Sequence, residues 1–352
     1  MPGGATRGRG CEHGTVTVTR PEPTDSGAAP PYAALRVGAA VEDWTGDARF
    51  HEYTQAANPV GRTTPLIPVE RFPASLHHHA PTGVVPLDLS GPLSIDTGPA
   101  TSPALLASFV TVLAGEELAT APVATSELYV VMAGEGITTL DGEGEPDGRA
   151  DRDATVAWST GDVFVLPGGM RSTHRATSDA TLYWVTDEPL LRYLGTAPAE
   201  PRLAPTRFSA ARCAAELARV AADPVAARRN RVSVLLNNAD QPQTLTATHV
   251  LWAMVGLLPV DAVQAPHRHQ SVALDLILDC EPGCYTLVGP RLDGDGAIVD
   301  AQRVDWEPGG AFVTPPGWWH AHHNESGAEA RLLPVQDAGL HTYLRTLDIR
   351  FA

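Results

Sequence analysis

The chain has 352 residues, of which 43% are hydrophobic and 19% are charged, and its formal net charge is −16. This length can bury a large core and suggests two domains, while the lack of an uninterrupted apolar run of about 20 residues argues against a membrane-spanning helix. The acidic balance argues against binding to a phosphate backbone, so we expect neither nucleic acid nor a membrane as a partner.

The N-terminal stretch, residues 1–31, is rich in Gly, Pro, Thr and Ala, and we expect it to be a disordered leader outside the fold. Four scattered cysteines are too few for a disulfide framework in a chain of this length. They are Cys11, Cys213, Cys280 and Cys284. A cytoplasmic location is therefore expected.

Short runs rich in β-branched and aromatic residues, separated by Gly, Pro and Asp turns, predict an all-β protein of the sandwich or barrel type. In the first half we expect strands at ASFVTVLAG, ELYVVMAGEG, DVFVLPGG and TLYWVTDE. In the second half we expect them at VLWAMVGLLP, VALDLILD, CYTLVG and AFVTPPG. One helix is predicted over residues 209–223, with Ser209 as its N-cap and an end before Pro224.

The two halves match each other at a fixed offset of 148 residues, because GDVFVLPGGMRSTH begins at Gly161 and GGAFVTPPGWWHAH begins at Gly309. The offset aligns Phe164 with Phe312, Pro167 with Pro315, Gly169 with Gly317, His174 with His322 and Glu127 with Asp275. An internal repeat of this kind predicts one structural unit present twice. We therefore expect a duplicated β-barrel.

A group of histidines in the second half has the spacing of a metal site. His267 and His269 are two residues apart on a predicted strand, so both side chains face the same way. A third imidazole would come from His320, which follows the Pro-Pro-Gly turn of the next motif. Three neutral imidazoles leave open coordination positions and suit iron, manganese, copper or zinc.

These residues resemble the two motifs of the cupin family. Gly309-x5-Pro315-x-Gly317-x2-His320-x3-Asn324 matches the second cupin motif, and His267-x-His269 matches the opening of the first. The resemblance implies two cupin barrels of the double-stranded β-helix, or jelly-roll, type in tandem, joined by a short helical segment. It indicates a fold and a metal site but not a reaction, because one fold can host many chemistries.

Within the cupins, the second half resembles the metal-bearing domain of the gentisate 1,2-dioxygenase and 1-hydroxy-2-naphthoate dioxygenase group. The stretches HRHQSVALDLIL, WHAHHN and YLRTLDIRF carry this resemblance. It implies an Fe(II) site formed by His267, His269 and His320 and oxygen-dependent cleavage of an aromatic ring. Mn(II) and Zn(II) are the alternative metals.

Two residues depart from the pattern of that group. Asp275 stands where the group has an arginine, and Arg345 stands where it has an aspartate. If the two positions face each other, we expect an ion pair with exchanged partners. The pocket would then no longer present that arginine to a substrate carboxylate, which makes gentisate itself a doubtful substrate. Alternatively, Asp275 is a fourth metal ligand, because it shares strand parity with His267 and His269.

The first half lacks the metal ligands. Ala119, Ala121 and Ser172 stand where the second half has its three expected ligands, so a structural role is predicted for the first barrel. The expected organisation is a leader (1–31), an N-terminal cupin without metal ligands (32–205), a helical connector (206–232) and a C-terminal metal-binding cupin (233–352).

The remaining site candidates surround the expected metal. Strand alternation points His322 into the cavity, where it is either a substrate-facing acid or base or a structural residue, and points His323 outward. Trp319, Gln270 and Trp252 are expected to line the substrate pocket, with plain packing as the alternative for the two tryptophans.

The leading interpretation is a bicupin that acts as a non-haem Fe(II) dioxygenase on O2 and a small aromatic substrate that is hydroxylated or aminated. One alternative is a manganese or zinc cupin that catalyses isomerisation, decarboxylation or hydrolysis. Another is a non-catalytic bicupin that binds a small molecule. Apolar strand edges on duplicated barrels also suggest a homo-oligomer.

Overall fold

The computed structural model describes residues 46–56, 64–140, 155–223 and 232–352. The expected leader, residues 1–31, lies outside these described residues. The chain divides into two compact units, Met1–Ala57 and Asn58–Ala352. The described part of the first unit contains one short helix, α1 (Tyr53–Ala56). The second unit contains both halves of the sequence repeat.

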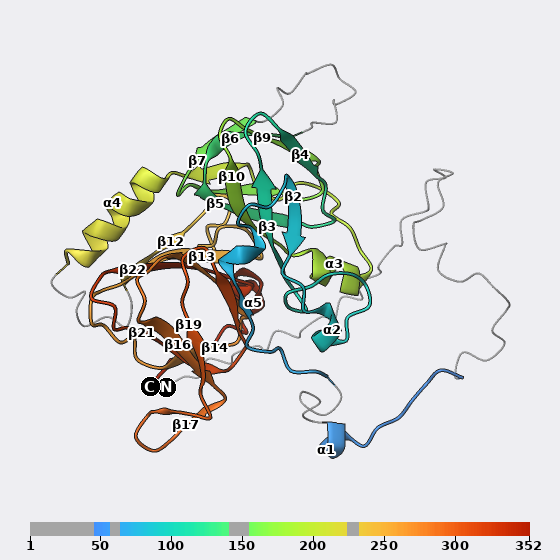
Figure 1. Ribbon diagram of the computed structural model, residues 1–352. Helices are drawn as coiled ribbons and strands as arrows, with labels where there is room; N and C mark the ends of the chain where they lie inside the picture. Colours follow the sequence, from blue (N-terminus) through green and yellow to red (C-terminus); the bar gives the residue numbers. More distant parts are fainter. Residues whose placement is uncertain (1–45, 57–63, 141–154, 224–231) are drawn as a thin grey trace, which may run out of the picture. The chain divides into compact units, whose positions relative to one another are not determined.

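The first half of the second unit forms a β-barrel of two antiparallel sheets (Figure 1). Its six-stranded sheet has the order β11 (Thr206–Phe208), β8 (Val163–Pro167), β5 (Ser126–Ala133), β10 (Ala180–Thr186), β3 (Leu106–Val112) and β2 (Gly83–Pro86). Its four-stranded sheet has the order β4 (Glu117–Thr120), β9 (Ser172–Ala176), β6 (Glu135–Leu140) and β7 (Thr155–Ser159).

The second half repeats this arrangement, as the sequence offset predicted. Its six-stranded sheet has the order β1 (Arg71–Phe72), β20 (Ala311–Thr314), β15 (Ala273–Asp279), β22 (Ala330–Gln336), β13 (Trp252–Leu258) and β12 (Val232–Leu236). Its other sheet has the order β19 (Gln302–Asp305), β16 (Cys284–Gly289), β21 (Trp319–Asn324), β14 (His267–His269) and β23 (Ile349–Phe351). A hairpin of β17 (Arg291–Leu292) and β18 (Ile298–Val299) extends from this sheet's loops.

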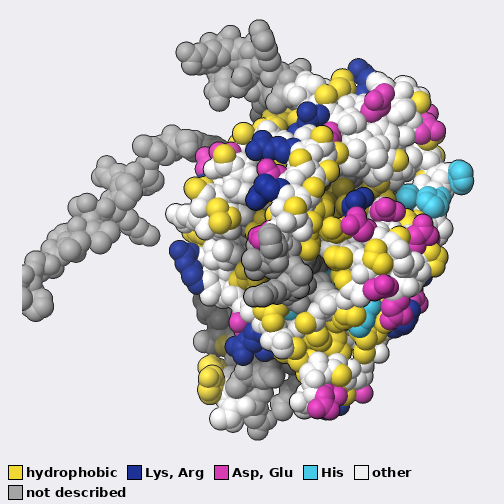
Figure 2. Space-filling view, turned by 90° about the vertical axis from the view of Figure 1, so that its left-hand side faces the viewer, with side chains coloured by type: hydrophobic (Ala, Val, Ile, Leu, Met, Phe, Trp, Pro, Cys, Tyr) yellow, Lys and Arg dark blue, Asp and Glu magenta, His cyan; other side chains and the backbone are white. Residues whose placement is uncertain are grey.

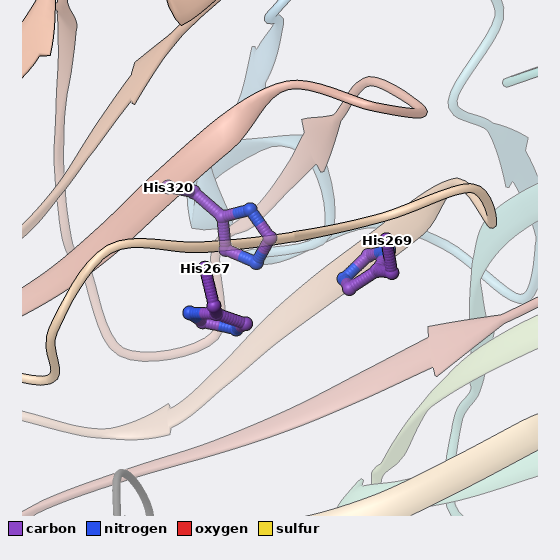
Figure 3. A group of neighbouring side chains, drawn as sticks. All are labelled: His267, His269 and His320. Atoms are coloured by element: carbon purple, nitrogen blue, oxygen red, sulfur yellow. The ribbon is translucent and has the colours of Figure 1, made fainter. Parts of the chain in front are cut away.

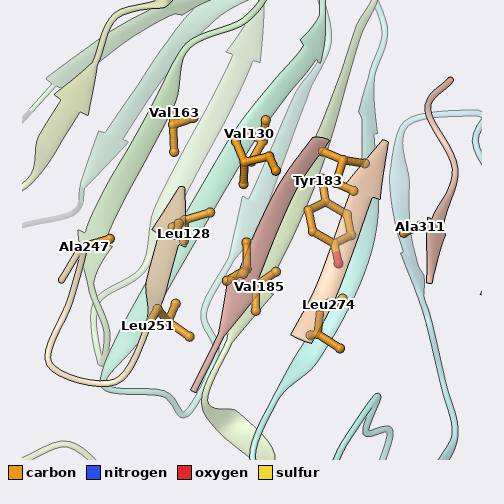
Figure 4. Close-up of a cluster of buried hydrophobic side chains, with 14 of the residues drawn as sticks. Leu128, Val130, Val163, Tyr183, Val185, Ala247, Leu251, Leu274 and Ala311 are labelled. Carbon is orange, nitrogen blue, oxygen red and sulfur yellow. The ribbon is translucent and has the colours of Figure 1, made fainter. Parts of the chain in front are cut away.

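The two six-stranded sheets share one hydrophobic core. Leu128, Val130 and Val185 of the first barrel belong to the same buried cluster as Leu251 and Leu274 of the second (Figure 4). Successive residues of a strand point to opposite faces, so the alternate residues of β5 lie inside their own barrel. Burial on both faces explains why these strands are continuous apolar runs rather than alternating ones.

Each barrel is completed by a strand from the segment that leads into the other one. β1 pairs with β20 of the second barrel, although it precedes the first barrel in the sequence. β11 pairs with β8 of the first barrel, although it precedes the second. Residues 71–72, within the range expected for the first cupin, thus pair in the sheet of the second barrel, and residues 206–208, within the expected connector, pair in the sheet of the first.

The predicted helix is confirmed as α4 (Ala210–Ala221), with the Ser209 side chain accepting a hydrogen bond from the backbone N–H of Arg212. α4 packs against β12 and β13. The other described helices are short and comprise η2 (Ala74–Leu76), α2 (Ser90–Leu93), α3 (Glu188–Leu194) and α5 (Ala338–Leu344). The architecture is therefore all-β with helices at its connections, as the sequence predicted.

Among the described residues, no helix is long and apolar enough to cross a membrane. Charged side chains of both signs are spread over the face shown in Figure 2, and its described residues form no single basic patch. The surface charge on this face is therefore distributed rather than concentrated.

Candidate metal centre

Three histidines of the second barrel come together at the predicted place. His267, His269 and His320 are buried, at 6%, 4% and 2% exposure, and one ligand nitrogen of each lies within 4.8 Å of the others. Figure 3 shows the three rings, two from β14 and one from β21, gathered around a common space. The predicted donor group is present in the fold.

The strand pairing explains how residues so distant in sequence meet. β14 and β21 are antiparallel neighbours, and His267 is the direct cross-strand partner of His320. The turn before β21 is held against β14, because the backbone N–H of Gly317 donates to the carbonyl of His269 at 2.7 Å. Gly317 has a φ of 74°, a conformation that glycine adopts without strain.

Backbone carbonyls fix the orientation of all three rings. The Nδ1 atoms of His267, His269 and His320 lie 3.4, 2.9 and 3.2 Å from the carbonyl oxygens of Ala265, Ser271 and Trp318. A carbonyl only accepts, so each Nδ1 donates, and in a neutral ring this leaves the Nε2 lone pair free to bind a metal. Such contacts are typical of metal-binding histidines. Three neutral imidazoles therefore offer Nε2 donors, and this donor set fits a divalent transition metal.

The histidines form one end of a cavity of about 340 Å³. Its polar lining includes Asp275, which accepts a hydrogen bond from the Thr314 hydroxyl at 2.9 Å, and Gln336, which accepts one from Ser271 at 2.8 Å. Asp275 lines the same cavity as the three histidines, and its role as a fourth ligand stays a prediction. The remaining lining residues are Ser233, Leu235, Trp252, Met254, Gln264, Ala273, Ile349 and Phe351.

No known protein-family model matches the sequence. A 1-hydroxy-2-naphthoate 1,2-dioxygenase of Nocardioides sp. (strain KP7) is 26% identical over 159 residues, which is 45% of this chain and 38% of that protein. A 5-aminosalicylate 1,2-dioxygenase of Comamonas sp. is 33% identical over 138 residues, which is 36% of this chain and 34% of that protein. The matched segments thus span little more than a third of these relatives.

Solved structures match over a larger share of the chain. The salicylate 1,2-dioxygenase of Pseudaminobacter salicylatoxidans has a TM-score of 0.61 at 12% identity, covering 87% of this chain and 95% of its own. The chain has a cupin fold. The predicted resemblance to these dioxygenases is confirmed in sequence and in fold. A seed protein, the procruciferin 11S globulin of Brassica napus, also matches, with a TM-score of 0.51 at 14% identity over 81% of this chain and 86% of its own.

The metal-site cupin departs from the prediction at two pocket positions. Trp319 lies on the outward face of β21, where the guanidinium of Arg268 sits 5.3 Å from its ring centre. Gln270 does not line the cavity either, and its place is taken by Gln264 and Gln336. Trp319 precedes His320 on the strand, so its side chain points to the face opposite that of His320. Trp252 does line the cavity, and its buried indole N–H has no hydrogen-bond partner.

The predicted ion pair between Asp275 and Arg345 is wrong. Arg345 is the exposed C-cap of α5, with a φ of 61°, and its guanidinium donates to the backbone carbonyl of Tyr343. A side chain held at the surface by its own helix end does not reach the cavity. Asp275 therefore lines the cavity without Arg345, which is not among the cavity-lining residues.

His322 is held in a hydrogen-bonded group that both cupin barrels contain. Its Nδ1 lies 2.8 Å from the Thr286 hydroxyl, which accepts a hydrogen bond from the Trp306 indole at 2.8 Å. In the first barrel, His174, Thr138 and Trp158 make the same contacts at 2.8 and 2.9 Å. Because the barrel without metal ligands keeps this group, its shared role is structural, and the acid or base role of His322 stays a prediction. His323 faces outward and stacks on Tyr285.

The interior of the first cupin barrel contains a stack of three aromatic rings. Tyr129 stacks between Phe164 and Trp184, with ring centres 4.8 and 5.5 Å apart. Tyr129 and Trp184 also donate hydrogen bonds to Glu127, which is fully buried. Burial raises the pKa of Glu127 to about 8 and lowers the pKa of His174 to about 4. Both groups are therefore neutral near pH 7.

Proposed function

We propose that the protein is a non-haem Fe(II) dioxygenase that cleaves the ring of a small aromatic substrate. The observation that carries this proposal is the group of three buried imidazoles, with ligand nitrogens within 4.8 Å of one another, that lines a largely apolar cavity. The names of the curated relatives support it, since both are 1,2-dioxygenases of aromatic compounds. When bound, the iron would supply open coordination positions for the substrate and for oxygen.

The chain's own residues would hold and orient the substrate. His267, His269 and His320 would hold the metal at one end of the cavity, and the apolar wall would keep bulk water from the reacting groups. Holding the ring in one pose is the contribution expected of such a cavity.

We propose that Asp275 changes which ring substituents are accepted. Its carboxylate lies in the cavity wall, 2% exposed, where the resembling group has an arginine. A carboxylate accepts hydrogen bonds from O–H and N–H groups and repels a second carboxylate. A ring that presents an O–H or N–H group to Asp275 is therefore favoured over one that directs a carboxylate at it, as a gentisate bound through the lost arginine would.

The first test is metal content per chain after purification without contact with an affinity metal. We expect near-stoichiometric iron in the wild type and its loss in His320→Ala, because two imidazoles hold a divalent ion far more weakly than three. His323→Ala is the matched control, since this ring lies on the outward face of the same strand and stacks on Tyr285. The control should keep its iron.

The second step is oxygen uptake by the iron-loaded protein with 5-aminosalicylate, 1-hydroxy-2-naphthoate and gentisate. Ring cleavage of an aminated or hydroxylated substrate supports the proposal, and resident manganese or zinc without oxygen uptake would favour a non-oxidative cupin enzyme. No metal in either protein would favour a non-catalytic bicupin, a possibility that the structural match to an 11S globulin keeps open.

A further inference from the structure

One strand of the metal-binding barrel has no counterpart among the described residues of the first barrel. The sheet order β4-β9-β6-β7 of the first barrel corresponds to β14-β21-β16-β19 of the second. The second barrel adds β23 on the free side of β14, the strand that carries two of the three histidines. The added strand therefore lies beside the site that distinguishes the two barrels.

The register of β23 directs two apolar side chains toward the site. Phe351 is the cross-strand partner of His267, and Ile349 is the partner of His269. Directly paired residues point to the same face of a sheet, and both side chains do line the cavity. The Phe351 ring lies 5.9 Å from the His267 ring, centre to centre, with an angle of 17° between their planes.

Both side chains remain partly open to solvent at this cavity. Phe351 is 60% exposed and Ile349 is 37% exposed, whereas the three histidines are buried. An exposed aromatic ring, almost parallel to the ring of a metal-binding histidine, provides a flat apolar surface beside the metal. A second ring bound at the metal could cover it, and aromatic pairs are attractive in offset stacked or edge-on arrangements.

We propose that Phe351 is the specificity-determining residue that packs against the ring of a metal-chelating substrate. The inference rests on the proposed function for the aromatic nature of the substrate. Phe351 holds no metal and takes no part in bond cleavage. It favours a chelating molecule that carries a ring over one with the same donor atoms and no ring.

The test compares two hydroxamic acids that share one bidentate headgroup and differ in whether they carry a ring. Benzohydroxamate carries a phenyl ring where acetohydroxamate carries a methyl group. Zn(II)-loaded protein is titrated with each compound in a calorimeter, a readout that needs neither oxygen nor turnover. We expect wild-type protein to bind benzohydroxamate about tenfold more tightly than acetohydroxamate, a ratio typical of one aromatic contact.

The variants separate packing from a general effect on the site. Phe351→Ala should reduce this ratio to about twofold or less by weakening benzohydroxamate alone, and Phe351→Leu should give an intermediate ratio. Tyr193→Ala is the matched control, because this aromatic residue is 81% exposed on α3, outside the metal-binding barrel. It should keep the wild-type ratio, and all variants should keep the wild-type zinc content.

Three outcomes would overturn the proposal. Phe351→Ala could bind both compounds as tightly as wild type does, it could bind both equally more weakly or lose its zinc, or wild-type protein could fail to bind benzohydroxamate. The second of these would assign Phe351 a structural role. If only the proposed function is wrong, Phe351→Ala would still lower the ratio of the two affinities, but no substrate would support oxygen uptake. Ring cleavage together with an unresponsive ratio would overturn this inference alone.

Discussion

The three metal-site histidines could be predicted from spacing alone, but their orientation could not. A two-residue step on a strand places His267 and His269 on one face, and the motif around Gly317 supplies His320. The carbonyls that hold the Nδ1 protons belong to turns whose course the sequence does not reveal. Phe351 and Gln336 also escaped prediction, because each reaches the cavity through a pairing distant in the sequence.

Glu127 makes the stability of the first barrel dependent on pH. Its carboxyl has an ordinary pKa of 4.5 and a folded-state pKa of about 8, so the folded chain keeps a proton that the unfolded chain loses within this window. The free energy of unfolding should therefore fall by about 1.4 kcal/mol per pH unit between pH 4.5 and 8. Below pH 4.5 this stabilisation is fully present, and above pH 8 it is lost.

Glu127→Gln removes this titration while keeping the shape of the side chain. In urea unfolding, the variant should be no more stable than wild type at pH 5 and clearly more stable than wild type at pH 8.5. Glu117→Gln is the control, because Glu117 is an exposed partner of Arg175. A stability difference between Glu127→Gln and wild type that does not change with pH would contradict the assignment.

At the scale of elements, the long strands were predictable, and the short edge strands β1, β11 and β23 were not. The apolar runs at β3, β5, β13 and β15 are long enough for their hydrophobic pattern to indicate strands. β1 has two residues, and β11 and β23 have three each, so they carry no periodic signal. These strands are defined by the sheet edges that receive them.

The pairing of β23 with β14 places two cations opposite each other. Arg350 is the direct cross-strand partner of Arg268, and like charges in this position are destabilising. Arg350→Thr should therefore slow amide hydrogen exchange of Phe351 by about two- to fivefold, the range expected for one cross-strand pair. Arg350→Lys, which keeps the charge, should exchange at the wild-type rate. Faster exchange in Arg350→Thr would show instead that the contact between Arg350 and Asp348 dominates.

At the scale of the whole molecule, the offset of 148 residues predicted two barrels but not how they are joined. The repeat is visible in the sequence because residues with the same hydrogen-bonding role stand 148 positions apart. Thr138 and Thr286, which contact His174 and His322, are one such pair. An offset reports similarity between two segments, and it contains no information on which barrel receives a given edge strand. The exchange of β1 and β11 therefore became visible only in the structure.

The shared core and the exchanged strands predict that both barrels unfold together. Leu182→Ala removes a fully buried side chain inside the first barrel and should cost about 2–5 kcal/mol. On heating, loss of far-ultraviolet circular dichroism and release of zinc from the second barrel should shift down by the same number of degrees. Zinc release at the wild-type temperature would show that the barrels unfold independently.

The crossing of β1 and β11 also bears on the ancestry of the fold. Suppose that the ancestor was a single barrel whose leading strand paired with the sheet of a second copy, as β1 and β11 pair here. Alone, such a barrel would have had an unpaired sheet edge. In a symmetric dimer, each copy would have covered the edge of the other. Gene duplication and fusion would then have made an existing domain-swapped dimer permanent within one polypeptide. We infer that pairing preceded fusion, and that one partner could lose its metal ligands because the other kept them.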